Sequence, residues 1–243
     1  MTNGFNSISR EVARDFLQSV VVVDDQASYD EEPAASPGTL VKPRRAAAKN
    51  ISVQGDPGSR NPRQLNAKVL VDAFAEKGIV CAVLKPKREE EWAEFLKNAG
   101  YAAQKADAII LDWRLLEDVQ GGKAMALLQA ILDRDREHAG KRSRSVLIYA
   151  GEPNPEEISG KLQEHLEFKP EKEDEVLRLI KPGCNVTILT KDHVHLSQEF
   201  EPFKVAERDL SERLIVEYAR KRTGLLANVA LKSLATLRLY AHD

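Results

Sequence analysis

Three mostly apolar runs in this chain each end at charged residues, and they constrain the fold more than any other feature of the sequence. The runs are SVVVV before Asp24 and Asp25, ADAIIL before Asp112, and NVTILT before Lys191. Short runs rich in β-branched residues and bounded by polar ones are typical of strands buried on both faces of a parallel sheet. The carboxyl ends of parallel strands meet at one edge of the sheet, where ligands bind. We therefore expect these four charged residues to lie together.

Strand-like and helix-like segments alternate along most of the chain. The predicted strands are 19–23, 79–84, 107–111, 145–150 and 186–189, and the predicted helices are 66–78, 87–98, 123–137 and 155–180, the last interrupted near Lys169 and Pro170. This alternation indicates βαβ units and therefore an α/β fold, a doubly wound five-stranded parallel sheet with helices on both faces. Right-handed crossovers favour the strand order 2-1-3-4-5, in which the first and third strands are neighbours.

Composition divides the chain into a sheet domain with attachments. We expect a helical lead-in over 1–18, which Ser7 could cap, then the sheet domain over 19–192. Residues 26–65 are rich in Pro, Gly, Ser and Ala, which predicts a flexible insertion. Its six basic residues against one acid between Lys42 and Arg63 leave two alternatives, a solvated linker or a contact with an acidic partner or a nucleic-acid backbone.

A C-terminal helical extension is expected over 193–243. Asp209 and Glu212 have capping-box spacing, and a second amphipathic segment begins at Thr223. Three alternatives remain for these helices: they cover the sheet, form a homodimer seam, or lead into a further module of a longer protein.

Bulk properties exclude several classes of protein. The net charge of -2 gives no general case for nucleic-acid binding. No apolar stretch approaches the roughly 20 residues of a membrane span, and the polar N-terminus lacks the features of a signal peptide. We therefore expect a cytoplasmic protein with no membrane partner. Its two cysteines, Cys81 and Cys184, are too few for a zinc site of their own and are expected to be reduced.

The charged residues at the strand ends suit Mg²⁺ and phosphoryl chemistry. Mg²⁺ prefers oxygen ligands and is usually held by one or two carboxylates. A carboxylate can attack phosphorus when Mg²⁺ offsets the repulsion between the two anions. A lysine ammonium can then neutralise the phosphoryl oxygens.

At these residues the chain resembles the receiver domains of bacterial response regulators, which have a flavodoxin-like fold. The resemblance covers 19–25 and 66–192, through the segments VVVVDDQ, AIILDWRL, VLIYAGE and ILTKD. The segments LDWRL, IYAGEP and GLLANVALKSLATLR are most similar to the divergent receiver-type domains of bacterial conflict and phage-defence systems.

The resemblance implies a role for each residue. Asp112 would accept a phosphoryl group, and Lys191 would pair with it. Mg²⁺ would be held by Asp24, Asp25 and Asp112 and by the backbone carbonyl of Arg114. The implied partners are a histidine kinase or another phosphodonor and an effector, as in a two-component phosphorelay. Such a protein accepts the phosphoryl group on one of its own residues and does not act as an enzyme on a separate substrate.

Two positions depart from the receiver pattern. Ala150 stands where receivers carry Ser or Thr, and Ile188 stands where they carry an aromatic switch residue. Tyr149 offers a hydroxyl next to Ala150, but the alternation of a strand directs it to the opposite face. We therefore expect the usual conformational relay to be altered, even where the phosphoryl pocket is retained.

Two other functions remain as alternatives. The first is a pseudo-receiver, a module for protein interaction or dimerisation without phosphotransfer. The second is a phosphohydrolase with an aspartate nucleophile, which usually carries a second acid two residues further on, where this chain has Gln26. The chain also lacks a GxxxxGK[ST] phosphate loop.

Overall fold

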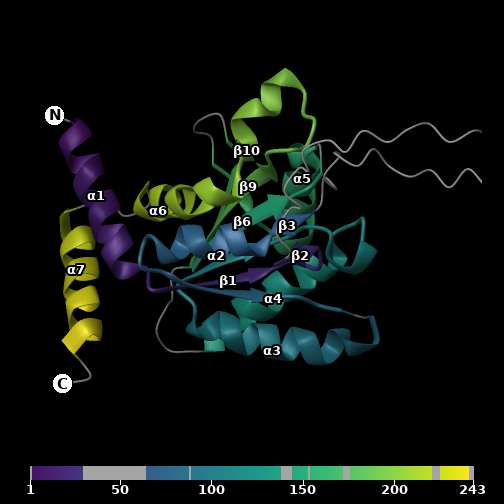
Figure 1. The fold of residues 1–243 in the computed structure, drawn as a ribbon, viewed down its shortest axis with the longest axis horizontal. Coiled ribbons are helices and arrows are strands. Elements are labelled where there is room, and N and C mark those ends of the chain that lie inside the picture. The colour runs from purple at the N-terminus through teal and green to yellow at the C-terminus, as the bar shows by residue number, and fades with distance from the viewer. Residues whose placement is uncertain are drawn as a thin grey trace, which may run out of the picture.

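A parallel-dominated sheet with helices on both faces forms the centre of the molecule (Figure 1). The computed structural model describes residues 2–29, 64–87, 89–137, 144–152, 154–171, 176–220 and 225–240. The helices are α1 (Thr2–Phe16), α2 (Ala67–Ala75), α3 (Trp92–Lys105), α4 (Gly122–Glu137), α5 (Pro155–Leu166), α6 (Leu210–Arg220) and α7 (Leu225–Tyr240). Short 3-10 turns lie at η1 (Glu89–Glu91), η2 (Leu115–Glu117), η3 (Gln198–Phe203) and η4 (Glu207–Asp209).

The predicted α/β class and strand order are confirmed. The strands are β1 (Ser19–Val23), β2 (Ala27–Ser28), β3 (Leu65–Asn66), β4 (Val80–Leu84), β5 (Ala108–Leu111), β6 (Arg144–Ala150), β7 (Lys169–Pro170), β8 (Arg178–Lys181), β9 (Cys184–Lys191) and β10 (Lys204–Val205). The order β4-β1-β5-β6-β9 is the predicted 2-1-3-4-5, and all four of its pairings are parallel.

The sheet extends beyond the five predicted strands, because β8 and β7 add an antiparallel hairpin and β10 pairs with β9. The predicted helix over 155–180 is therefore wrong in its second half. Helix α5 ends at Leu166, and the next residue, Glu167, has a left-handed backbone conformation. Leu179 is fully buried, and its strand β8 pairs with β9. This pairing is non-local, so the apolar spacing within the segment did not reveal it.

Two apolar clusters lie on opposite faces of the sheet. One joins β5, β6 and β9 to α3, α4 and α5, and it includes Ile109, Ile148 and Ile188. The other joins the alternate residues of the same strands to α1, α2 and α6, as Ile110 and Leu189 illustrate. Burial on both faces explains why these strands read as continuous apolar runs.

Helices α1 and α6 belong to the same core as the sheet. Leu214 and Tyr218 of α6 are buried in one cluster with Val12 of α1 and Val20 of β1, so α6 is a covering helix. Helix α1 begins at Thr2, earlier than the cap predicted at Ser7. Helix α7 lies beside α1, where Asn228 donates a hydrogen bond to Ser9 (Figure 1).

The two ends of the predicted insertion 26–65 pair with each other. Ala27 lies opposite Leu65 in the parallel pair formed by β2 and β3. The Lys85 ammonium donates to the Ala27 carbonyl at 2.7 Å and holds this pair beside the end of β4. Residues 30–63 of the insertion lie outside the described residues. Within the described ranges, no helix is long and apolar enough to cross a membrane.

Candidate functional site

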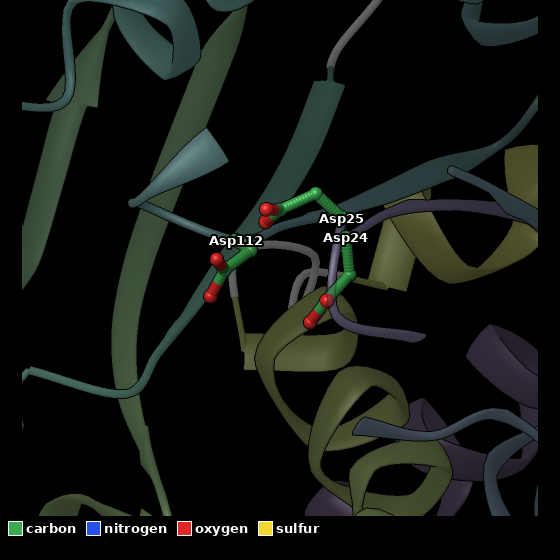
Figure 2. Close-up of side chains that lie close together, drawn as sticks. All are labelled: Asp24, Asp25 and Asp112. Carbon is green, nitrogen blue, oxygen red and sulfur yellow. The ribbon is translucent and has the colours of Figure 1, made fainter. Parts of the chain in front are cut away.

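Residues from three strands meet at the carboxyl edge of the sheet, as predicted from the sequence. Asp24 and Asp25 follow β1, Asp112 follows the neighbouring β5, and Lys191 is the last residue of β9. The Lys191 Nζ atom lies 2.9 Å from Asp24 Oδ2 and 3.4 Å from Asp112 Oδ1. Figure 2 shows the three carboxylates gathered where β1 and β5 end. The edge thus holds three acids and one base in close contact.

The three carboxylates form a set of oxygen atoms suited to a hard cation. Each of Asp24, Asp25 and Asp112 offers one oxygen, and these oxygens all lie within 4.8 Å of one another. All three residues are buried. Among the described residues, no donor other than the Lys191 ammonium approaches either oxygen of Asp112. Because buried carboxylate oxygens without donors are costly, this set fits Mg²⁺, whose preferred ligands are carboxylate oxygens.

Burial and neighbouring negative charges both affect the pKa of Asp112, the candidate phosphoacceptor. Burial, with the negative charges of Asp24, Glu152 and Asp25 and against the opposing effect of Lys191, raises the pKa of Asp112 to about 7. Burial alone would lower the pKa of Lys191, but Asp112 and Asp24 outweigh this and raise it above its ordinary value. The lysine is therefore a fixed positive charge, and the carboxylates around it carry an excess of negative charge that a cation would relieve.

Two further residues at this edge were not identified from the sequence. Gln26 donates from its backbone N to Asp24 Oδ1 at 2.7 Å and from its Nε2 to Asp25 Oδ2 at 2.9 Å. Gln26 thus orients both acids of the pair. Glu152 lies close enough to Asp112 for its charge to raise the pKa of that residue. The position of Gln26 directly after the acid pair was a usable signal, whereas Glu152 lies in a loop with no periodicity.

A tightly packed loop follows Asp112 and sets its position. Trp113 is 2% exposed, and its indole lies over Gly121, where a Cβ atom would come within 2.2 Å of the ring. Gly121 also has a φ of +73°, a conformation that side chains disfavour. The Arg114 side chain donates to Glu117 Oε2 at 2.9 Å. The predicted role of the Arg114 carbonyl as a ligand stays a prediction.

The two positions that depart from the receiver pattern are both buried in apolar surroundings. Ala150 and Ile188 lie in the cluster on the α3, α4 and α5 face, and Ala150 pairs with Thr190 of β9. Tyr149 lies on the other face, as strand alternation predicted, and its hydroxyl donates to the Val205 carbonyl at 2.7 Å. The Tyr149 hydroxyl is therefore engaged at β10, and its ring lies 5.8 Å from the Lys191 ammonium.

Comparison with known proteins agrees with the geometry. Residues 16–196, which are more than half of the chain, match the family model described as response receiver domain. Searches of the curated proteins and of the solved structures found no significant match.

Proposed function

Because this chain belongs to the response receiver domain family, we propose that Asp112 accepts a phosphoryl group in a two-component-type phosphorelay. The observation that carries the proposal is the contact of Lys191 with both Asp24 and Asp112 at the carboxyl edge of the sheet. An acid pair that can hold Mg²⁺, a single acid that can attack phosphorus and a lysine that can neutralise phosphoryl oxygens thus meet from three strands.

In the proposed reaction, an Asp112 carboxylate oxygen forms a bond to phosphorus. The bond between phosphorus and the donor atom breaks, and its electron pair leaves with the donor, either the imidazole of a kinase histidine or the acetate of acetyl phosphate. Bound Mg²⁺, held by Asp24, Asp25 and Asp112, would offset the repulsion between the carboxylate and the phosphoryl oxygens. Lys191 would form an ion pair with the transferred phosphoryl group. The protein would carry one such group and would not turn over substrate.

The direct test is incubation with acetyl phosphate and Mg²⁺, read by intact mass. We expect a phosphoadduct in the wild-type protein and in Asp133→Asn, because Asp133 is an exposed acid on α4. We expect none in Asp112→Asn or when a chelator removes the metal. Failure of the wild-type protein to form an adduct, with acetyl phosphate and with the cognate kinase, would contradict the proposal.

A second candidate function is a pseudo-receiver that binds a partner or dimerises without phosphotransfer. Its support is the apolar environment of Ala150 and Ile188, which offers no hydroxyl at the usual position. The outer face of α7 is also apolar, with Leu226 85% exposed and Leu237 65% exposed. If Leu226→Ser and Leu237→Ser abolished partner binding or dimerisation while Asp112→Asn did not, this function would be favoured.

We also propose that the protein takes part in phage defence. This proposal rests on the segments LDWRL, IYAGEP and GLLANVALKSLATLR. Loss of protection from phage infection in cells that carry Asp112→Asn in place of the wild-type protein would support it, and unchanged protection after deletion of the whole chain would contradict it.

A further inference from the structure

Strand β4 forms an outer edge of the sheet. Within the described residues, β1 is the only strand that pairs with it. The sequence of β4 is VCAVL, which contains neither a charged residue nor a proline. Natural edge strands commonly carry such residues, because they block pairing with a strand of another chain. The β4 edge therefore lacks a common protection against the addition of a further strand.

The hydrogen bonds to β1 show which residues of β4 face the sheet. The Val80 N–H donates to the Gln18 carbonyl at 2.8 Å, and the Leu84 carbonyl accepts from the Asp24 N–H at 3.2 Å. Successive residues of a strand direct their backbone groups to opposite sides. Val80 and Leu84, with Ala82 between them, therefore use their backbone groups to pair with β1.

The two intervening residues, Cys81 and Val83, direct their backbone N–H and C=O groups away from the sheet. No residue in the described ranges forms a hydrogen bond with these outward groups. Outward N–H and C=O groups that alternate along an edge match those of an added strand. The backbone of β4 is thus arranged to accept one.

Side chains on one face of this edge are also left uncovered. Val80 is 70% exposed, and Ala82 is exposed as well. On the neighbouring helix α3, Trp92 and Phe95 stack with their ring centroids 5.7 Å apart and are only half-buried. Both rings pack against the same apolar cluster as Leu84. An apolar strip therefore runs along β4 and the flank of α3.

We propose that β4 pairs with β4 of a second copy of this chain, antiparallel and about a two-fold axis at Ala82. In this register, Cys81 of each copy lies opposite Val83 of the other. Each such pair exchanges N–H···O=C bonds in both directions, so the outward groups of both strands are satisfied. The sheets of the two copies then join into one continuous sheet.

The side chains of β4 favour a second copy as the occupant. The small Ala82 lies at the axis, where the two strands approach most closely, and Val80 of each copy lies opposite Leu84 of the other. Because the strand carries no charge, no like charges oppose each other across the axis. The edge is therefore complementary to itself, as a two-fold interface requires.

The size of the contact sets the expected strength of the dimer. A standard interface buries about 800 Å² per partner over roughly 20–30 residues. The contact proposed here consists of the five residues of β4 and the flank of α3 at Trp92 and Phe95, which is less. We therefore expect a dimer that forms reversibly and depends on protein concentration.

The test is sedimentation equilibrium of the whole protein over a wide range of concentration. We expect the average mass of the wild-type protein to rise from that of a monomer toward that of a dimer. Ala82→Lys should weaken self-association at least about tenfold, or about 1.4 kcal/mol, because it opposes two ammonium groups at the axis. Since Ala82 is exposed, this variant should fold, which its melting temperature at low concentration would verify.

The matched control is Leu226→Lys, which adds the same charge at a residue of α7 that is 85% exposed. This variant should self-associate like the wild-type protein. A wild-type protein that sediments as a monomer at every soluble concentration would overturn the proposal. Loss of the dimer in Leu226→Lys but not in Ala82→Lys would assign the interface to α7 and overturn it as well.

Disulfide crosslinking tests the register. In a Cys81→Ala background, Ala82→Cys should form a disulfide between two chains on mild oxidation. Opposite residues in a non-hydrogen-bonded antiparallel pair have Cα atoms about 4.5 Å apart, within the span of a disulfide. Ser233→Cys, which is exposed on α7, should stay unlinked in the same background. Equal crosslinking of the two variants would indicate random collision and would overturn the proposed register.

Discussion

The Lys191 ammonium lies 2.9 Å from Asp24 Oδ2, although the two residues are 167 positions apart in the chain. The Lys191 side chain is 0% exposed and that of Asp24 is 2% exposed. The pair therefore links the carboxyl ends of β1 and β9, which β5 and β6 separate in the sheet. The Asp112 carboxylate contacts the same ammonium.

Lys191→Met should destabilise the protein by roughly 3–5 kcal/mol without metal, because it leaves buried carboxylates without their positive partner. Urea unfolding would measure the change. Lys68→Met, which removes an exposed lysine paired with Asp72, should change stability by less than about 1 kcal/mol. Added Mg²⁺ should recover part of the loss in Lys191→Met, and equal stability of the two variants would contradict the structural role of Lys191.

Mg²⁺ should raise the melting temperature of the wild-type protein, since a ligand that binds only the folded state stabilises it, by about 2.7 kcal/mol at a hundred times its dissociation constant. Asp25→Asn should reduce this shift because it removes one of the three gathered carboxylates. Asp72→Asn, an exposed acid on α2, should keep the full shift. A wild-type melting temperature insensitive to Mg²⁺ and to chelator would count against the metal site.

The stability of the protein should depend on pH through Glu217. Burial acts to raise the pKa of Glu217, but the hydrogen bond from Arg178 and the charges of Arg178, Arg213 and Arg220 outweigh it and lower the pKa below its usual value of 4.5. The folded protein therefore binds this proton more weakly than the unfolded chain. The stabilising contribution of Glu217 is complete above pH 4.5 and is lost as the pH falls through the lowered value.

Glu217→Gln should accordingly lower the free energy of unfolding by roughly 1–3 kcal/mol at neutral pH. This difference from the wild-type protein should shrink below pH 4.5. Urea unfolding of both proteins across this range would measure it. Glu212→Gln, an exposed acid on the same helix, should remain within about 1 kcal/mol of wild type at every pH. If the difference in unfolding free energy between Glu217→Gln and the wild-type protein were the same at every pH, the charge of Glu217 would not be its cause.

Gly121→Ala should destabilise the protein by roughly 2–4 kcal/mol, because the new Cβ meets Trp113 and the positive φ disfavours a side chain. It should also slow phosphorylation, since Trp113 adjoins Asp112. Gly160→Ala is the matched control: its Cβ would meet nothing within 4 Å in α5, so a gain of about 0.5–1 kcal/mol is expected. Thermal unfolding of the pair gives the comparison, and a neutral Gly121→Ala would contradict the packing argument.

Several features could be predicted from the sequence because they depend on local patterns. Strands buried on both faces are continuous apolar runs, so β1, β5, β6 and β9 were recognisable without any knowledge of their partners. The start of the helix predicted over 66–78 was equally local: α2 begins at Ala67, and the Asn66 side chain accepts from the Val69 backbone N at 3.1 Å.

Other features arise only from contacts between distant segments. The strands β7 and β10 have two residues each, too short for any periodicity, and only their pairing with β8 and β9 identifies them as strands. One cavity is lined by Arg10 of α1, Arg178 of β8 and Arg220 of α6, and nothing in the spacing of these residues along the chain predicts that they meet.

The sequence by itself determined the class of fold, the order of the five parallel strands and the convergence of Asp24, Asp25, Asp112 and Lys191, because parallel strands in a known order bring their carboxyl ends to one edge. Only the tertiary structure decided that Gln26 orients the acid pair, that Glu152 acts on Asp112, and that α6 covers the sheet. The physical reason is that periodicity records which side of a segment is buried, whereas the partner that buries it is chosen by packing of the whole chain.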